Sequence, residues 1–583
     1  MKNQISKLTF DIECNGLAPD KIWCIVAKEY KGDTFIFRYD EDNIEDGIEL
    51  LQKADILIGH NIIGFDIPVL NKLYNIDLLK DKEIIDTLVM SRLFNPVREG
   101  GHGLESWGYR LKIYKAEKPL KWDEFDPQMI PYCEQDVIVN EALYDRLLLD
   151  GSSFSKDSVE VEHEVTKILQ QQEEHGFYFD EKKAMELLVS LKKRMKEVED
   201  EVHKVFKPKW VDDKIVTPYI KKDGDLSKRG LTDAEYERVF QTKDYKPFMR
   251  KKYQEFNLGS RKQIGEYLKD FGWEPNRFTP TGQPIIDEGT LNKIKHIPEA
   301  RMIAEFLLLQ KRIAQINSWF DVVENKRVHG RVFSIGAITN RMSHRSPNMA
   351  QVPSIKSEYG KECRACWTVP EGYKLVGIDA SGLELRMLAH YMNDEEYTNE
   401  LIHGDIHTRN KEIAGLKSRD KSKSFVYALL YGAGDAKLGE VVGGNKATGK
   451  RLRQQFLNNL PSFKSLRSRV EEAAQRTYLK GLDGRKVFVR HQHAALNTLL
   501  QSAGAIVMKV ALIMLNTLAK EEKITFNFVA NVHDEWQVEV LEEEAARLGE
   551  LGVRAIQQAG KYLNLRCPLD GEYKIGNGWD ETH

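Results

Sequence analysis

The stretch YKLVGIDASGLELRMLAHYM, residues 373–392, carries the pattern on which the predicted fold rests. An apolar run of strand-forming residues ends at Asp379, and after a short glycine-containing turn the apolar residues recur at helical spacing. Sheets of α/β and α+β domains place catalytic groups where a strand ends. We therefore take Asp379 as the first candidate for a catalytic carboxylate.

A second candidate lies in FNFVANVHDEWQVEV, residues 526–540. Apolar and polar residues alternate on both sides of HDE, which predicts a β-hairpin with Asp534 near its tip. A shared sheet could bring Asp379 and Asp534 together. Two carboxylates holding two Mg²⁺ ions suit the attack of a sugar hydroxyl on an α-phosphate. Taken alone, the segment is better explained as a polar hairpin turn.

Between these segments lies RDKSKSFVYALLYGAG, residues 419–434. Arg419, Lys423, Tyr427 and Tyr431 recur at every fourth residue, so they share one side of a predicted helix. Two cations followed by two aromatic rings suit a triphosphate and then a sugar and base. His407, slightly upstream, could add a phosphate contact. The alternative is an ordinary amphipathic helix with solvated cations and tyrosines in the core.

The first 150 residues or so predict a separate α/β unit with three acidic segments. Asp11 and Glu13 are two apart on a predicted strand, so both point to one face. Asp66 follows a strand and a loop, near a helix start, and Tyr132 and Asp136 share a helix face. Four carboxylates and a phenol could hold two Mg²⁺ ions and orient a water for phosphodiester hydrolysis. Each segment alone is more often a solvated surface feature.

In this order and within one α/β unit, the three acidic segments resemble the DEDD-type 3′–5′ exonucleases, in the subgroup with a tyrosine in the third motif. The segment GGHGLESWGYRL, between the second and third motifs, is similar to that family as well. The resemblance implies an RNase H-like α/β fold. It also implies that Asp11, Glu13, Asp66 and Asp136 are metal ligands and that Tyr132 orients the water.

The C-terminal segments resemble the family A DNA polymerases, with Asp379, residues 419–434 and Asp534 in motifs A, B and C. The segments DASGLELRMLAHYM, GDIHTRN, RDKSKSFVYALLYGAGD and LNTLLQSAGA are most similar to the replicative polymerases of short-tailed, T-seven-like phages. The resemblance implies an α+β right hand with palm, fingers and thumb. It further implies template-directed DNA synthesis with 3′–5′ proofreading in phage DNA replication.

The same resemblance implies roles at further positions. Ala380 would offer its backbone carbonyl to a metal ion, and Glu384 would crowd a ribose 2′-hydroxyl and so select deoxynucleotides. Two Mg²⁺ ions are implied at each of the two sites. The residues implied to contact the incoming nucleotide are Glu384, His407, Arg419, Lys423, Tyr427 and Tyr431. Those implied to contact the primer–template, mostly through minor-groove edges or the primer end, are Arg341, Asn497, Gln501 and His533.

These placements predict three domains: an exonuclease domain (1–155), a thumb (156–330) with a basic insertion at about 207–256, and palm and fingers (331–583), the fingers at about 395–480. The helical pattern at 158–206 predicts the thumb stem. Ser260 is the predicted N-cap of a helix at the thumb tip. Between Lys204 and Lys262 there are 16 basic and 9 acidic residues, which suits direct DNA contact or a partner. A solvated basic loop is the alternative.

Composition bounds the class of protein. The 583 residues are 41% hydrophobic and 30% charged with a net charge of −3, which excludes collagen, coiled coils and disordered chains. No apolar run is long enough for a transmembrane helix, and the N-terminus lacks the core of a signal peptide. Six scattered cysteines favour an intracellular location, which for a phage-encoded protein is the cytoplasm of a bacterial host. Because the first exonuclease strand begins within ten residues of Met1, we expect no 5′ nuclease ahead of it.

The expected partners are primer–template DNA and dNTPs, and no membrane. The resemblance adds helicase–primase, single-strand-binding protein and a processivity factor at the thumb insertion. Two alternatives stay open: an exonuclease with a catalytically inactive, DNA-binding polymerase-like region, and a single-subunit RNA polymerase. The presence of both Asp379 and Asp534 opposes the first, and Glu384 together with the exonuclease segments opposes the second.

Overall fold

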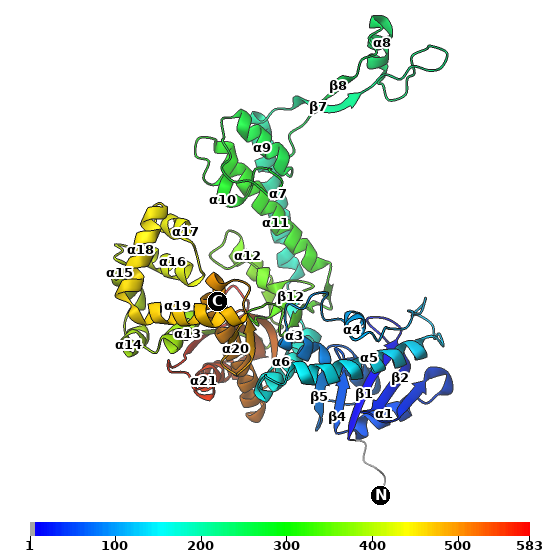
Figure 1. The fold of residues 1–583 in the computed structure, drawn as a ribbon, viewed down its shortest axis with the longest axis vertical. Helices are drawn as coiled ribbons and strands as arrows, with labels where there is room; N and C mark the ends of the chain where they lie inside the picture. Colours follow the sequence, from blue (N-terminus) through cyan, green and yellow to red (C-terminus); the bar gives the residue numbers. More distant parts are fainter. Residues whose placement is uncertain (1–5) are drawn as a thin grey trace. The chain divides into compact units, whose positions relative to one another are not determined.

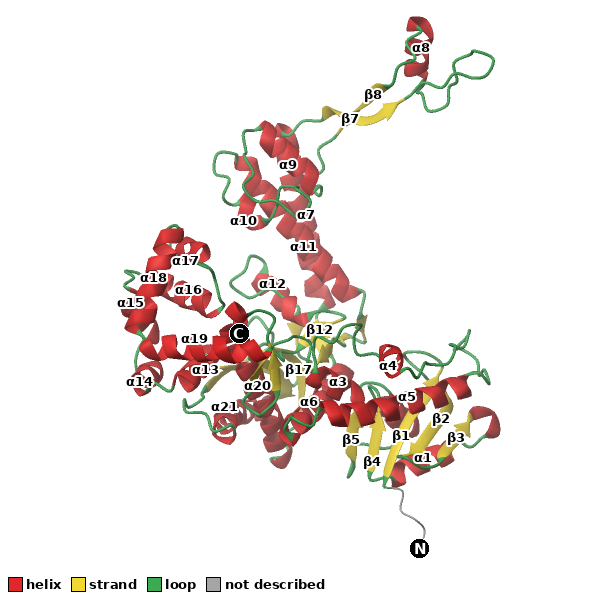
Figure 2. Cartoon of the chain, viewed as in Figure 1, coloured by secondary structure: helices red, strands yellow, loops and turns green. Residues whose placement is uncertain are grey.

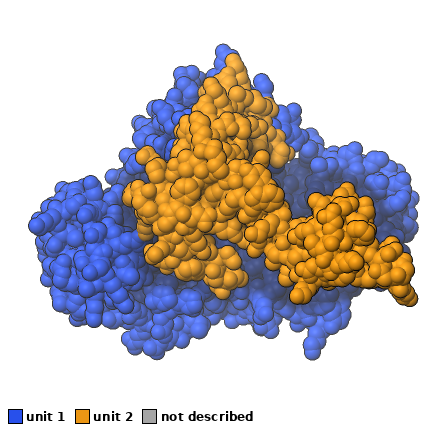
Figure 3. Space-filling view, turned by 90° about the horizontal axis from the view of Figure 1, so that it is seen from above, with its two compact units in different colours: residues 1–180, 322–583 blue, residues 181–321 orange. Residues whose placement is uncertain are grey.

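The computed structural model describes residues 6–583, which form two compact units. Unit 1 combines the chain up to Asp180 with Val322–His583, and unit 2 is Glu181–Asp321. Figure 3 colours the two units separately. The boundaries of the two units, after Asp180 and after Asp321, follow from packing and differ from the sequence-based domain boundaries at 155 and 330. The sequence-based boundaries of the functional domains stay a prediction.

The N-terminal part of unit 1 is a five-stranded mixed sheet in the order β3-β2-β1-β4-β5 (Figure 2). Strands β1, β2 and β3 pair antiparallel, whereas β4 and β5 continue the sheet in parallel. Helices α1 (Ile44–Lys53) and α2 (Asp66–Tyr74) cover one face, and α5 (Met129–Asp150) covers the other. The strands are β1 (Lys7–Cys14), β2 (Ile22–Glu29), β3 (Thr34–Arg38), β4 (Ile56–Gly59) and β5 (Glu83–Asp86).

Alternation along β1 decides which side chains reach which face of this sheet. Leu8, Phe10 and Ile12 are buried in the core formed with α1 and α2. The intervening Asp11 and Glu13 therefore face the side of the sheet that α5 covers. Asp11 touches α5 directly, because the Cys133 thiol donates to its backbone carbonyl at 3.4 Å.

A second sheet in unit 1 is antiparallel throughout, in the order β17-β18-β14-β19. Val376, Ile378, Trp536 and Val538 point from its central strands into a core shared with α20 (Ala495–Glu521) and α21 (Ala545–Tyr562). Asp379 and its cross-strand partner Glu535, together with Gln537 and Glu539, lie at the alternate positions and face the other side of the sheet. The strands are β14 (Tyr373–Ala380), β17 (Phe526–Val532), β18 (Glu535–Leu541) and β19 (Gly571–Gly576).

Helix α20 is the central helix of this core. By length and composition, Gln492–Glu521 could cross a membrane, but 83% of its apolar window is buried inside the structure. A helix whose apolar residues are already covered by protein needs no lipid. It is therefore a core helix.

Seven consecutive helices, α13 to α19, form a helical subdomain of unit 1 (Figure 1). Helix α16 carries Arg419, Lys423 and Tyr427 of the series that recurs at every fourth residue, which we call the ladder, and Tyr431 is the C-cap residue just after it. Ser418 caps the start of the helix, and Gly432, with φ of 76°, follows its end. The helices are α13 (Leu383–Met392), α14 (Glu395–His403), α15 (Ile406–Ala414), α16 (Arg419–Leu430), α17 (Asp435–Val441), α18 (Lys446–Asn459) and α19 (Pro461–Ala473).

The helical pattern at 158–206 is divided between the two units. Helix α6 (Lys156–His175) packs against β17 and α20 in unit 1, and Gly176 and strand β6 (Phe177–Phe179) interrupt the pattern. Only α7 (Glu181–Val205) lies in unit 2. The expectation that one stem comprises all of 158–206 thus differs from the packing, because α6 has its apolar face on the second sheet.

Unit 2 is built on two long helices, α7 and α11 (Pro298–Phe320), which are joined by paired hydrogen bonds from Arg194 to Glu305 of 2.7 and 3.1 Å. Helices α9 (Arg261–Asp270), capped by Ser260 as predicted, and α10 (Glu288–Leu291) follow. The basic insertion forms what we call the arm, residues 209–254. It is the antiparallel hairpin of β7 (Lys209–Val216) and β8 (Phe248–Gln254) with helix α8 (Asp233–Thr242) between them.

Shorter elements complete unit 1: β9 (Val323–Glu324), β10 (Arg327–Val328), β11 (Arg331–Phe333), β12 (Ser343–Arg345), β13 (Trp367–Thr368), β15 (Tyr478–Lys480), β16 (Lys486–Phe488), α3 (Thr87–Phe94), α4 (Leu104–Leu111) and α12 (Gly360–Arg364).

Candidate active sites

The first candidate site lies where the hairpin of β17 and β18 meets the end of β14. The hairpin is closed by two residues, His533 and Asp534, and the φ of 59° at His533 allows this tight turn. Across the sheet, Asp379 is the register partner of Glu535. The backbone N–H of Ala380 donates to the carbonyl of Asp534 at 3.2 Å. The two candidate carboxylates therefore come from β14 and from the turn that leads into the adjacent strand β18.

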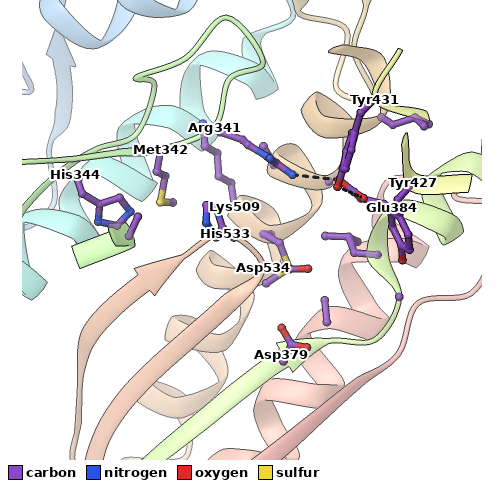
Figure 4. A pocket seen from close by; sticks show the side chains of 18 residues that line it. Arg341, Met342, His344, Asp379, Glu384, Tyr427, Tyr431, Lys509, His533 and Asp534 are labelled. Atoms are coloured by element: carbon purple, nitrogen blue, oxygen red, sulfur yellow. Dashed lines mark hydrogen bonds and ion pairs between the residues drawn. The ribbon is translucent and has the colours of Figure 1, made fainter. Parts of the chain in front are cut away.

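A cavity of about 470 Å³ opens over these carboxylates (Figure 4). Sequence-predicted residues from four segments of the chain meet in its lining: Arg341, Asp379, Ala380, Glu384, Tyr427, Tyr431, His533 and Asp534. A cavity of this size lined by converging polar groups is the usual form of a small-molecule site.

The electrostatics of the cavity favour bound cations. Burial and the neighbouring Asp534 raise the pKa of Asp379 to about 7. Burial also raises the pKa of Asp534, against the effect of His533 and Arg341. Two carboxylates pressed together in this way carry negative charge that divalent cations relieve. The donor set of carboxylate and backbone oxygens suits Mg²⁺.

Glu384 is held in place at the rim of the cavity. The Tyr431 hydroxyl donates to Glu384 Oε2 at 2.7 Å, and Arg341 Nη2 lies 3.5 Å from Glu384 Oε1 (Figure 4). The rings of Tyr427 and Tyr431 are 6.2 Å apart. Two aromatic rings and a fixed carboxylate thus line one side of the cavity.

The cations of the ladder lie outside the lining of this cavity. Arg419 donates two hydrogen bonds, of 2.8 and 3.0 Å, to the carboxylate of Asp405, the N-cap of α15. His407 Nδ1 is buried with no hydrogen-bond partner within residues 6–583. Burial, and then Lys423 and Arg419, lower the pKa of His407. The three cationic or basic side chains are therefore electrostatic neighbours on α15 and α16.

Asn497 and Gln501 lie one turn apart on α20, both half-buried. The structure places them on the helix that also supplies Leu500 and Gly504 to the cavity, but not in the lining that it describes.

Sequence reasoning missed Lys509, which lines the cavity from α20. Its Nζ donates to Glu162 at 2.7 and 2.9 Å and to the Asn340 carbonyl at 2.9 Å, and Arg485 pairs with the same glutamate. All three charged side chains are at most 1% exposed. The available signal was a single lysine in the apolar run IVMKVALIM, which predicts a buried and paired charge.

The second candidate site lies between the five-stranded sheet and α5. Asp66 begins α2, and its Oδ1 accepts the backbone N–H of Ile12 at 3.3 Å, between Asp11 and Glu13. Burial and then Asp66 and Glu13 raise the pKa of Asp11 well above its usual range, while burial raises that of Asp66 to about 7. The pKa of Glu13 is raised to about 9 by burial, by Cys24 and by Asp136. The four predicted carboxylates thus form one electrostatic cluster.

Asp136 has an oxygen that is free to bind a cation, and Asp11 and Glu13 lie close to one another in the same cluster. Asp136 Oδ1 is buried without a hydrogen-bond partner among the described residues. Carboxylate oxygens of Asp11 and Glu13 and the Cys133 sulfur lie within 4.8 Å of one another. An unpaired buried oxygen beside three further carboxylates fits a divalent cation.

Lys115 is the residue of this site that sequence reasoning missed. Its Nζ lies 2.5 Å from Asp136 Oδ2 and 4.6 Å from the centre of the Tyr132 ring. Burial raises the pKa of Tyr132, and a hydrogen bond with Lys115 opposes that rise. Lys115 belongs to the loop between α4 and α5, where no periodic pattern marks it.

Comparisons with known proteins cover nearly the whole chain. The family model described as DNA polymerase family A matches residues 233–581. The DNA-directed DNA polymerase of Enterobacteria phage T3 is 34% identical over 99% of this chain and 100% of its own, and that of Escherichia phage T7 is 33% identical over 98% and 99%. A polymerase domain from M. smegmatis, solved in complex with DNA primer-template and dNTP, has the same fold, with a TM-score of 0.79 at 19% identity, covering 99% of this chain and 96% of that one.

Proposed function

The chain belongs to DNA polymerase family A and is a phage-type DNA-directed DNA polymerase, and from this premise we propose that it also proofreads with a 3′–5′ exonuclease built on the five-stranded sheet. The observation that carries the proposal is the cluster of four carboxylates from β1, α2 and α5 with an unpaired oxygen on Asp136. The order β3-β2-β1-β4-β5 supports the expected RNase H-like fold. The alternative of an inactive polymerase-like region has no support, since the phage relatives match along the whole chain.

At the polymerase site, Asp379, Asp534 and the backbone carbonyl of Ala380 would hold two Mg²⁺ ions. When bound, such ions activate the primer 3′-hydroxyl and neutralise the charge of the triphosphate. Glu384, fixed by Tyr431 and Arg341, narrows the cavity where the sugar would lie and so excludes a 2′-hydroxyl.

Nucleotide and DNA contacts extend beyond this cavity. Arg419 can exchange Asp405 for phosphate oxygens, because a guanidinium binds carboxylate and phosphate in the same two-fold geometry. His407 and Lys423 lie beside it and would bind the same triphosphate. For the primer–template we propose Arg341 and His533, at the cavity, and Asn497 and Gln501 on α20.

At the exonuclease site, Asp11, Glu13, Asp66 and Asp136 would hold two Mg²⁺ ions, which supply an activated water and a charge to stabilise the leaving oxygen. Tyr132, on the same face of α5 as Asp136, orients that water. The water oxygen would bond to phosphorus while the bond from phosphorus to the 3′ oxygen of the preceding nucleotide breaks. That oxygen takes up the proton that the water gives up, and the terminal nucleotide leaves as a 5′-monophosphate.

Replacing Asp11 and Glu13 by alanine tests the proposed exonuclease. We expect the double variant to lose degradation of a single-stranded oligonucleotide while primer extension stays within about threefold of wild type, because the sites are separate. Glu45→Ala with Glu49→Ala is the matched control, since both glutamates are exposed on α1 at the opposite face of the sheet. Degradation at the wild-type rate in the Asp11 and Glu13 variant would refute the ligand assignment.

The arm is the part of unit 2 that suits DNA contact. Trp210 and Tyr253 are opposite each other on one face of the hairpin, 67% and 60% exposed, with their rings 5.5 Å apart. Ile215 and Met249 continue this face, and Lys251 lies between them and Tyr253. Rings beside cations are typical of surfaces that bind nucleic acid by stacking and charge. Helix α8 covers the other face, where Arg238 lies 4.2 Å from the Phe248 ring.

Further partners and the location follow from the phage relatives. We place the protein in the cytoplasm of a bacterial host, where helicase–primase and single-strand-binding protein would work beside it. A processivity factor on the arm is the alternative to direct DNA contact there.

A further inference from the structure

Lys115 is held at the exonuclease site by the loop that carries it. The backbone turns at Lys112, where φ is 59°, and the Ile113 N–H donates to the Gly108 carbonyl at 3.0 Å. Gln135 Nε2 donates to the Tyr114 carbonyl at 2.8 Å. Consecutive residues of the loop, Tyr114 and Lys115, are thus tied to consecutive residues of α5, Gln135 and Asp136.

The ammonium group of Lys115 contacts the two side chains of α5 that the proposed chemistry uses. Its Nζ is 2.5 Å from Asp136 Oδ2 and 4.6 Å from the centre of the Tyr132 ring. Only 17% of the Lys115 side chain and 8% of the Asp136 side chain are exposed. We propose that Lys115 is a positioning residue of the exonuclease, which fixes Asp136 so that only Oδ1 faces the metal ions and fixes the Tyr132 phenol toward the attacking water.

The free oxygen of Asp136 supports this division of roles. Lys115 occupies Oδ2, while Oδ1 is buried without a partner in the part of the chain that the structure describes. A carboxylate with one oxygen bound to a cationic donor can offer a metal ion only the other, in one orientation. Partners of this kind, which orient ligands without touching the substrate, typically change activity by about 10- to 100-fold when they are removed.

A hollow of about 340 Å³ adjoins the same groups and supplies a matched control. It is lined by Glu105, Tyr109, Tyr114, Lys115, Ala116, Lys118 and Tyr132. Lys118 is on the same loop and lines the same hollow, but it is exposed and forms no ion pair with Asp136 among the described residues. Replacing Lys118 removes the same charge from the hollow without removing the proposed contact.

The inference rests on the proposed exonuclease, so the test begins with wild-type protein on a single-stranded oligonucleotide. Lys115→Met, which keeps the length of the side chain, should lower kcat about 10- to 100-fold and leave KM within about twofold. Lys118→Met should leave kcat within about twofold. Lys115→Arg, which keeps the charge, should recover part of the loss.

Two further measurements separate positioning from a structural role. Mn²⁺ binding without DNA is measured in an Asp379→Ala/Asp534→Ala background, so that the polymerase site does not contribute. Lys115→Met should bind Mn²⁺ at least as tightly, because a positive charge is removed. A double-mutant cycle with Tyr132→Phe should show coupling, with the double variant losing less than the product of the two single losses.

The outcomes are distinct. No degradation by wild type would refute the proposed exonuclease and the role of Lys115 with it. Degradation by wild type with an unchanged kcat in Lys115→Met would refute the role of Lys115 alone. A rise in KM without a fall in kcat would make Lys115 a substrate contact, and weaker Mn²⁺ binding with a lower Tm would make it structural; each of these overturns the inference.

Discussion

The two carboxylate sites of unit 1 both bring acidic side chains together in a partly buried place, but they do so with different numbers of carboxylates from different elements. At the proposed polymerase site, Asp379 near the end of β14 and Asp534 in the adjoining hairpin turn open into one cavity. At the proposed exonuclease site, the carboxylates come from three elements, and Glu13, Asp66 and Asp136 are at most 8% exposed. Burial raises the pKa values at both sites, and the number of crowded acids is larger at the second.

The cations near the two sites differ in what they contact. Arg341 and Lys509 line the polymerase cavity but pair with Glu384 and Glu162, which are not proposed ligands. Lys115 pairs directly with Asp136, a proposed ligand. Cations next to the polymerase cavity therefore hold residues of its wall in place, whereas Lys115 holds a proposed metal ligand in place. Loss of such a cation should therefore affect folding at the first and chemistry at the second.

The largest effect on activity is expected from Asp534→Ala, which removes a proposed metal ligand of the polymerase site only. A metal ligand stabilises the transition state by several kcal/mol, so primer extension should fall by about 10³-fold or more. Degradation of single strands should not change. Glu572→Ala is the control, because Glu572 is opposite Asp379 on β19 but exposed outside the cavity. Extension above about a tenth of the wild-type rate in Asp534→Ala would contradict the assignment.

Glu162→Gln sharpens the claim that Lys509 supports the wall of the cavity. The substitution leaves Lys509 and Arg485 buried without their carboxylate, so unfolding of unit 1 should become easier by about 3–5 kcal/mol. Denaturant titration measures the change. Glu164→Gln, on the same helix and in a partly exposed pair with Lys167, should cost less than about 1 kcal/mol. Equal effects of the two variants would contradict the buried role.

The stability that Glu162 adds to unit 1 should decrease at low pH. Burial alone would raise the pKa of Glu162, but Lys509 and Arg485 together lower it below its ordinary value. The stability that Glu162 adds is therefore present above the unfolded-state pKa of about 4.3 and is lost as pH falls through the lower folded value. The contribution of Glu162 to the difference between wild type and Glu162→Gln should therefore shrink as pH falls below about 4.

Tyr427→Phe sharpens the placement of the nucleotide. Tyr427 lines the cavity near Glu384 and Asp534, both of which contribute to its raised pKa after burial. Its hydroxyl can replace the 3′-hydroxyl that a dideoxynucleotide lacks, and a hydrogen bond to a charged group is worth about 1.5–3 kcal/mol. The variant should therefore raise the ratio of kcat/KM for dNTP over ddNTP by roughly 10- to 150-fold.

The ratio is measured with the exonuclease disabled by Asp11→Ala/Glu13→Ala. Tyr478→Phe, on β15 outside the cavity, serves as the control and should leave the ratio unchanged. A ratio that does not rise in Tyr427→Phe would show that this ring is not beside the sugar.

The smallest effect on DNA synthesis is expected from removing most of the arm. This deletion tests whether synthesis at the proposed polymerase site depends on unit 2. Val211 and Lys252 are paired across the hairpin, so an Asn-Gly turn can replace residues 212–251. Product length per binding event should fall about 2- to 10-fold with a weaker salt dependence, because cationic contacts with DNA are lost. The single-nucleotide rate should not change. Unchanged product lengths at low enzyme concentration would favour a solvated basic loop.

The elements that meet at the proposed polymerase site could be predicted from the sequence because they are local patterns, whereas the roles of their residues stay predictions. The strand–turn–helix at Asp379, the hairpin at Asp534 and the ladder from Arg419 to Tyr431 each lie within about 20 residues. Their common place on one sheet and one cavity followed only from the resemblance and the structure. The DNA-contact roles of Asn497 and Gln501 stay predictions.

The features that sequence reasoning missed depend on long-range contacts or on interrupted patterns. Glu162 and Lys509 meet across 347 positions of the chain, and Lys115 lies in a loop without periodicity. In the arm, the bulge between Asp212 and Lys214 shifts the alternation, which hid the strand β7. The division of 158–206 between units was hidden because a three-residue strand interrupts two similar helical patterns.

The most direct test of two separate sites is one primed template, assayed with and without dNTPs, for wild type, Asp534→Ala and Asp11→Ala/Glu13→Ala. Wild type should lengthen the primer when dNTPs are present and shorten it when they are absent. Asp534→Ala should only shorten the primer, and Asp11→Ala/Glu13→Ala should only lengthen it. Loss of both activities in either variant, or shortening by Asp11→Ala/Glu13→Ala, would contradict the account.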